Sequence, residues 1–181
     1  MPVNPRSLVT NGRINYAFAA SPGKQGPCKT DPMTVSFVCR TEATLPREVL
    51  FDLARSIDAH LESQQKSGER AVGGVTSGLI GEGQTVTWRA RHFGVPFTMT
   101  SSITSLEFPV RFVDEQVKGP FKSFRHVHQF EATDGGSIMT DHVEFTAPLG
   151  ILGRIAEQVV LARYLERLIA ERGRFLAGHQ P

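Results

Sequence analysis

The spacing of hydrophobic positions changes along the chain and predicts a strand followed by two short helices. Residues 34–40 alternate between apolar and polar side chains, which is typical of a half-buried strand. Residues 44–48 (TLPRE) have the proline and early acidic residue of a helix start, with an apolar face from Val49 to Ala54. A second short helix is predicted from Ser56 to about Gln65, and Gly68 follows its end.

The chain beyond Gly68 alternates with period two and is divided by short turn-type segments. We predict strands at 71–75, 85–93, 97–106, 110–117, 121–132 and 137–146. Glycine, proline or aspartate marks the segments between them, at 81–83, 94–96, 108–109, 118–120 and 133–136. Such short linkers predict a meander of neighbouring antiparallel strands.

Residues 151–176 return to a helical period. Apolar side chains recur every three to four residues, at Leu152, Ile155, Val159, Ala162, Leu165, Ile169 and Phe175 or Leu176. Charged residues fall mostly elsewhere. The pattern predicts one long amphipathic helix whose apolar face packs on the sheet.

Length and charge indicate one domain preceded by an arm. The chain has 181 residues, enough for a core without disulfides. Residues 1–33 are rich in proline and glycine and have little periodicity, so we expect a flexible N-terminal arm, or a start at Met33, before a single domain at 34–178. The net charge of +2 is interspersed, so we expect no nucleic-acid partner.

Cysteine usage and hydropathy predict the compartment. Cys28 and Cys39 have no CxxC or Cys/His spacing, so we expect reduced thiols. No apolar run approaches the roughly 20 residues of a membrane-spanning helix, and the N-terminus lacks the pattern of a secretory signal. We expect a cytoplasmic protein without a transmembrane segment; the oligomeric state is left open.

Several sequence stretches resemble a known superfamily. They are 88–94 (WRARHFG), 112–116 (FVDEQ), 119–121 (GPF), 126–130 (HVHQF), and 141–145 (DHVEF) with 148–150 (PLG). Together with the element order, residues 34–176 resemble the START-like (SRPBCC) superfamily, which includes birch-pollen-allergen, lipid-transfer and polyketide cyclase/dehydrase proteins. The resemblance is greatest to a bacterial ligand-binding or cyclase-like branch. It implies an α+β helix-grip fold, with a curved antiparallel sheet wrapped around the last helix and a cavity between them.

Strand alternation then selects the side chains that would face the cavity. The predicted ligand-binding residues are Trp88, His92, Phe97, Met99, Phe112, Gln116, Phe124, His126, His128, Met139 and Phe145. Most are apolar and a few are polar, which suits a small hydrophobic or aromatic molecule of lipid-like or polyketide-like character.

The histidine pair allows a metal site, but we expect no metal and no cofactor. His126 and His128 are two apart on a strand and present both rings on one face, and Asp114, Asp141 or His92 is available as a third ligand. Nothing in the sequence fixes the distances between them. The favoured interpretation is that both histidines are structural or contact the ligand.

Asp114 and Asp141 on inward faces need partners, because a buried unpaired carboxylate is costly. An imidazole partner would form either a structural bridge, which is favoured, or a general acid/base pair with His126 or His128. Three functions follow: a binding protein, which is favoured; a cyclase/dehydrase-like enzyme using these catalytic candidates; and a protein-interaction adaptor using the outer helix or the basic arm.

Overall fold

The computed structural model describes residues 34–92, 94–147 and 154–179, with side chains of the last segment from Val160 onward. The predicted arm 1–33 with Cys28 and Met33, and also Phe93, the 148–150 stretch, Leu152 and the side chains of Ile155 and Val159, lie outside this description. The described part contains β1 (Thr34–Ala43), α1 (Arg47–Ala54), α2 (Ile57–Ser63), η1 (Gln65–Ser67), β2 (Arg70–Gly74), β3 (Thr85–His92), β4 (Val95–Glu107), β5 (Arg111–Lys118), β6 (Ser123–Thr133), β7 (Gly136–Thr146) and α3 (Arg154–Ala177).

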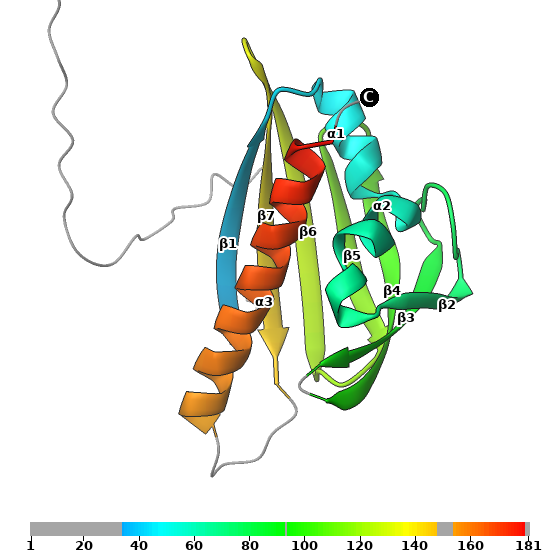
Figure 1. Ribbon diagram of the computed structural model, residues 1–181, viewed down its shortest axis with the longest axis vertical. Coiled ribbons are helices and arrows are strands. Elements are labelled where there is room, and N and C mark those ends of the chain that lie inside the picture. Colours follow the sequence, from blue (N-terminus) through cyan, green and yellow to red (C-terminus); the bar gives the residue numbers. More distant parts are fainter. Residues whose placement is uncertain (1–33, 93, 148–153, 180–181) are drawn as a thin grey trace, which may run out of the picture. The chain divides into compact units, whose positions relative to one another are not determined.

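The strands form one antiparallel sheet in the order β1-β7-β6-β5-β4-β3-β2. Strands β2 to β7 form a meander, and β1 pairs with β7 as an edge strand of the sheet. Figure 1 shows α3 running along β1 and β7, with α1 and α2 over the same face of the sheet. The helix-grip class expected from the sequence is confirmed.

Period-two burial positions the inward side chains. Along β3, Val86, Trp88 and Ala90 are buried and alternate with more exposed neighbours. The start of β4 differs from the sequence prediction, which assigned 94–96 to a linker. In the structure Val95 already pairs with His92, because Gly94 has a positive φ of 78° and allows a tight turn.

The last helix packs closely on the sheet. The side chains of Leu161, Ala162, Leu165 and Ile169 lie against a cluster formed by Phe121, Phe124, Val143 and Phe145. Farther along the helix, Gly173 faces Thr41 of β1 so closely that an added Cβ would collide with the threonine side chain. Leu176 is fully buried in the main core. These contacts fix which face of α3 is turned inward.

Candidate functional site

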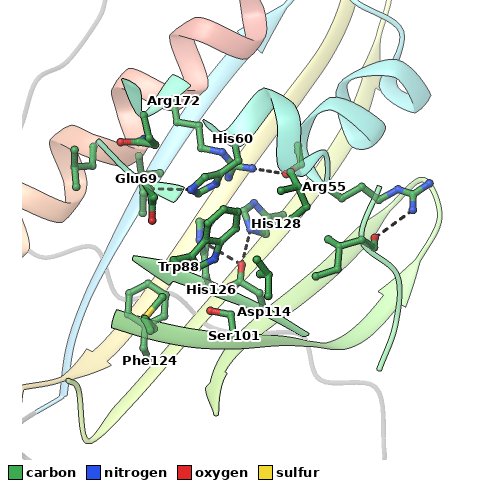
Figure 2. A pocket seen from close by; sticks show the side chains of 18 of the residues that line it. Arg55, His60, Glu69, Trp88, Ser101, Asp114, Phe124, His126, His128 and Arg172 are labelled. Atoms are coloured by element: carbon green, nitrogen blue, oxygen red, sulfur yellow. Dashed lines mark hydrogen bonds and ion pairs between the residues drawn. The ribbon is translucent and has the colours of Figure 1, made fainter. Parts of the chain in front are cut away.

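A cavity of about 170 Å³ lies between the sheet and the helices. Strands β3 to β6 supply most of its wall, α2 covers one end and α3 closes the side (Figure 2). Apolar side chains dominate the lining: Ile57, Ile80, Val86, Trp88, Phe97, Met99, Ile103, Phe112, Phe121, Phe124, Leu165, Leu168 and Ile169. The polar lining residues include Ser101, Asp114, His126, His128 and Arg172, and also Arg55, His60, Glu69 and His92.

The structure brings eight of the eleven predicted ligand-binding residues to this cavity. They are Trp88, His92, Phe97, Met99, Phe112, Phe124, His126 and His128. Gln116, Met139 and Phe145 do not line it. The Gln116 amide hydrogen-bonds the backbone of Phe121, and Met139 and Phe145 are fully buried in the core. Helices pack over β7, so its inward side chains form core instead of cavity wall. That any of the eleven binds a ligand stays a prediction.

Two carboxylates enclose the two imidazoles; we call Asp114, His126, His128 and Asp141 the Asp–His cluster. Strand register places them together, because Asp114 of β5 pairs with His126 of β6, and Asp141 of β7 pairs with His128. The predicted association of these inward carboxylates with imidazoles is therefore present. His92, the other possible third ligand, lies elsewhere: its Nδ1 is 2.7 Å from the Tyr164 hydroxyl.

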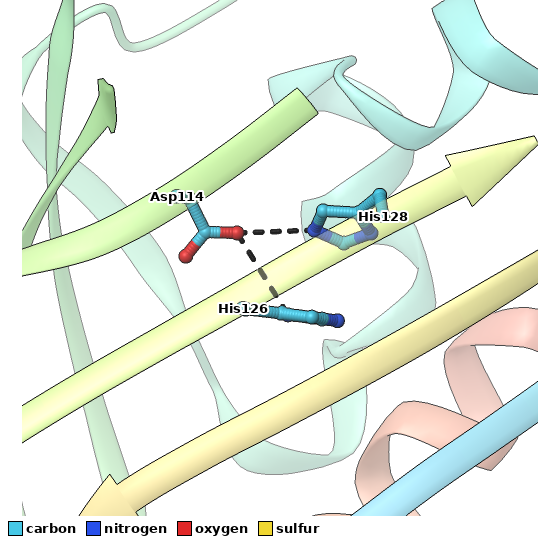
Figure 3. Close-up of side chains that lie close together, drawn as sticks. All are labelled: Asp114, His126 and His128. Carbon is cyan, nitrogen blue, oxygen red and sulfur yellow. Dashed lines mark hydrogen bonds and ion pairs between the residues drawn. The ribbon is translucent and has the colours of Figure 1, made fainter. Parts of the chain in front are cut away.

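Each imidazole has one nitrogen toward each carboxylate. Asp141 Oδ1 lies 2.9 Å from His126 Nε2, in a hydrogen bond, and 2.7 Å from His128 Nδ1, without hydrogen-bond alignment. On the other side, Asp114 Oδ2 is 3.0 Å from His128 Nε2, in a hydrogen bond, and 3.7 Å from His126 Nδ1 (Figure 3). Asp114, His126 and His128 line the cavity, whereas Asp141 is 1% exposed and lies behind the rings.

Electrostatic coupling sets the charge of the cluster. Burial acts to raise the pKa values of Asp114 and Asp141, but the imidazoles outweigh it and hold both below the ordinary range. Burial and the adjacent His128 lower the pKa of His126. Burial also acts to lower the pKa of His128, but the two carboxylates outweigh it and raise that pKa. The cluster therefore holds two carboxylates, one neutral imidazole and one imidazole that is readily protonated.

Arg172 is a cavity residue that the sequence prediction missed. It comes from α3, lines the cavity, and donates from a guanidinium nitrogen to the carbonyl of Ala54. Its Nε has no hydrogen-bond partner among the described residues, although the side chain is buried. Arg172 is seven residues after Leu165, so it falls on the apolar stripe of the helix. A charged residue on the apolar face of the helix was the sequence signal that could have identified Arg172 as a cavity residue.

Three more polar residues, His60, Glu69 and Ser101, line the cavity. His60 of α2 stacks on Trp88 with ring centroids 4.2 Å apart, and its Nε2 is 3.1 Å from Glu69. Ser101 is 3% exposed and lines the cavity, and its hydroxyl has no partner in the described part of the chain. A buried hydroxyl without a partner is a group that a bound molecule can satisfy.

Comparisons with known proteins identify the fold. No family model matches the chain, and no curated protein matches its sequence. Among solved structures, Ara h 8.0201 has a TM-score of 0.53 at 18% identity, over 80% of this chain and 99% of that one. TTHA0849 from Thermus thermophilus has a TM-score of 0.63 at 13% identity, over 80% and 94%. Ginseng major latex-like protein 151 from Panax ginseng has a TM-score of 0.58 at 16% identity, over 82% and 99%.

At these identities the likeness establishes the helix-grip fold alone. The bacterial ligand-binding branch stays a prediction, as do general acid/base catalysis by the Asp–His cluster and the adaptor function. Within the described residues, no helix is long and apolar enough to cross a membrane.

Proposed function

We propose that the protein binds a small aromatic or otherwise apolar molecule in the cavity. The observation that carries the proposal is the combination of a mainly apolar wall with a few buried polar groups, among them the Ser101 hydroxyl, which has no partner in the described part of the chain. Burial of apolar surface supplies the driving force, and a few polar groups orient the molecule. Within the cavity, the Ser101 hydroxyl can donate to a ligand oxygen or accept from a ligand hydroxyl, and Asp114 can accept from a hydroxyl.

Size narrows the class of molecule. A cavity of about 150 Å³ lined by apolar side chains is large enough to bind benzene. The cavity of about 170 Å³ therefore suits one aromatic ring or a short acyl segment. A second apolar hollow of about 220 Å³ shares His92, Phe97, Phe121 and Leu165 with it. A longer polyketide-like or lipid-like ligand would place one end in the inner cavity and its remainder in this hollow.

Two neighbouring serines of β4 provide a matched test. Ser101 faces the cavity, whereas the Ser102 hydroxyl lies on the exposed face and donates to the carbonyl of Gln84. We expect 4-methylphenol to bind the wild-type chain and Ser102→Leu in isothermal titration calorimetry. Ser101→Leu should bind more than about tenfold more weakly, because its added methyl groups occupy the ligand volume. Equal affinity in the two variants, or no binding to the wild-type chain, would contradict the proposal.

A further inference from the structure

We propose that Asp114, His126 and His128 form a binding site for a divalent transition-metal ion of the Zn²⁺ class, against the expectation of no metal. The three side chains offer donor atoms that all lie within 4.8 Å of one another (Figure 3). This site does not depend on the proposed binding of an apolar molecule.

The donor spacing fits a metal ion. Nitrogen and oxygen ligands about 2.0–2.1 Å from Zn²⁺ in a tetrahedral arrangement lie about 3.4 Å from each other. Asp114 Oδ2 is 3.0 Å from His128 Nε2 and 3.7 Å from His126 Nδ1, on either side of that spacing. Two imidazoles and one carboxylate favour a transition metal over Mg²⁺ or Ca²⁺, which prefer oxygen ligands alone.

Asp141 supplies the outer support that such sites need. Metal-bound histidines usually donate their second ring N–H to a carboxylate or carbonyl, which fixes the ring and its tautomer. Here His126 Nε2 is hydrogen-bonded to Asp141 Oδ1 at 2.9 Å, and His128 Nδ1 lies 2.7 Å from the same oxygen without hydrogen-bond alignment. With protons on His126 Nε2 and His128 Nδ1, the lone pairs of His126 Nδ1 and His128 Nε2 face Asp114. The two rings thus have the Asp141 carboxylate on one side and the Asp114 carboxylate on the other, whereas a structural ion pair requires only one carboxylate.

The site is open on one side. Asp114 is partly exposed, with 20% of its side chain accessible, and all three proposed ligands line the cavity. The buried Ser101 hydroxyl, which has no partner among the described residues, lines the same space. Three protein ligands with an open fourth position are typical of zinc sites that bind water or an oxygen of a small molecule. That fourth position would point into the cavity.

Calorimetry with ZnCl₂ on the full, chelator-treated chain tests the site. We expect one tight Zn²⁺ per chain in the wild type and in His142→Asn. His142 is a matched control, because it is on β7 and contacts Gln129 instead of the cluster. Asp141→Asn should weaken binding about 10–100-fold through loss of outer support, and Asp114→Asn should weaken it at least as much.

The visible absorption spectrum of Co²⁺ bound to the wild-type chain is a second test, which needs no variant and therefore still applies if a variant fails to fold. The proposal predicts an intense visible absorption typical of four-coordinate Co²⁺ without a thiolate charge-transfer band. Wild-type binding that Asp114→Asn leaves unchanged, a thiolate band, or only the weak spectrum of hydrated Co²⁺ would overturn it. Each of these results leaves the separate 4-methylphenol experiment to decide the proposed function.

Discussion

The imidazole rings of His126 and His128 lie face to face, with centroids 3.8 Å apart and planes inclined by 34°. Two protonated rings at this distance would repel each other in a buried setting. The pKa of His126 is accordingly lowered by burial and by His128, whereas the carboxylates raise that of His128 against the effect of burial. The two flanking carboxylates therefore favour a proton on His128, which offsets the effect of burial on this tilted pair.

Removing the Asp141 carboxylate should destabilise the fold. Asp141→Ala would leave the buried His126 without its hydrogen-bond acceptor and remove a carboxylate beside His128, and breaking a buried pair by removing one partner costs about 3–5 kcal/mol. Urea denaturation with a chain carrying Asp134→Ala as the control measures the loss. Asp134 is exposed in the turn between β6 and β7, so its variant should change the free energy of unfolding by less than about 0.5 kcal/mol. Similar losses in the two variants would contradict a stabilising Asp–His cluster.

The contact between α3 and β1 predicts an unusual response to a helix substitution. Alanine normally stabilises a helix interior relative to glycine by about 1 kcal/mol. Gly173→Ala should instead lower the free energy of unfolding, because the added Cβ collides with the Thr41 side chain. Thermal and urea unfolding of Gly173→Ala, Thr41→Ala and the double variant measure the coupling. The double variant should regain stability relative to Gly173→Ala. Stabilisation by Gly173→Ala alone would show that α3 packs with another face.

Cys39 is predicted to be an unreactive thiol in the folded protein. Burial, followed by the negative charges of Asp141 and Glu166, raises its pKa from 9.0 to about 11. At pH 8 this lowers the thiolate fraction about 100-fold, and only the thiolate reacts. In a Cys28→Ser chain, iodoacetamide should modify the native protein more than about 100-fold more slowly than the guanidinium-unfolded one. Equal rates would contradict the buried position of Cys39.

The same shift predicts how stability changes with alkaline pH. A folded-state pKa raised above the unfolded value favours the neutral thiol in the fold. The resulting contribution to stability is complete below pH 9 and is lost as the pH rises toward 11. Urea midpoints of the wild type and Cys39→Ala should therefore converge or cross over this interval. Parallel curves would show that Cys39 ionises as easily in the folded chain as in the unfolded one.

Local periodicity predicted the order of helices and strands and part of the site, and the helix-grip class followed from the resemblance of the chain to a known superfamily. Alternation on β6 placed His126 and His128 inward, because one face of a strand must be buried and the period is two. The sequence could not show that Asp114 and Asp141 lie on opposite sides of these rings. That arrangement depends on the register of three strands and on the direction of each side chain.

The remaining differences come from the position of the helices. Met139 and Phe145 share the inward face that alternation predicts, but helices cover β7 and place them in the core. Arg172 reaches the cavity from α3, and His60 reaches Trp88 from α2. These contacts join segments far apart in the sequence, and no periodic pattern within one element specifies them.

Trp88 allows the most direct measurement of ligand binding in the cavity. It is the only tryptophan in the chain, it lines the cavity, and it is 7% exposed. An iodinated phenol quenches tryptophan fluorescence on contact, whereas iodide ion in solution reaches only exposed rings. Titration with 4-iodophenol should therefore quench Trp88 along a saturable curve that 4-methylphenol reverses, and iodide should have little effect. Quenching that rises linearly without saturation, or no quenching by 4-iodophenol, would contradict binding of a small apolar molecule in this cavity.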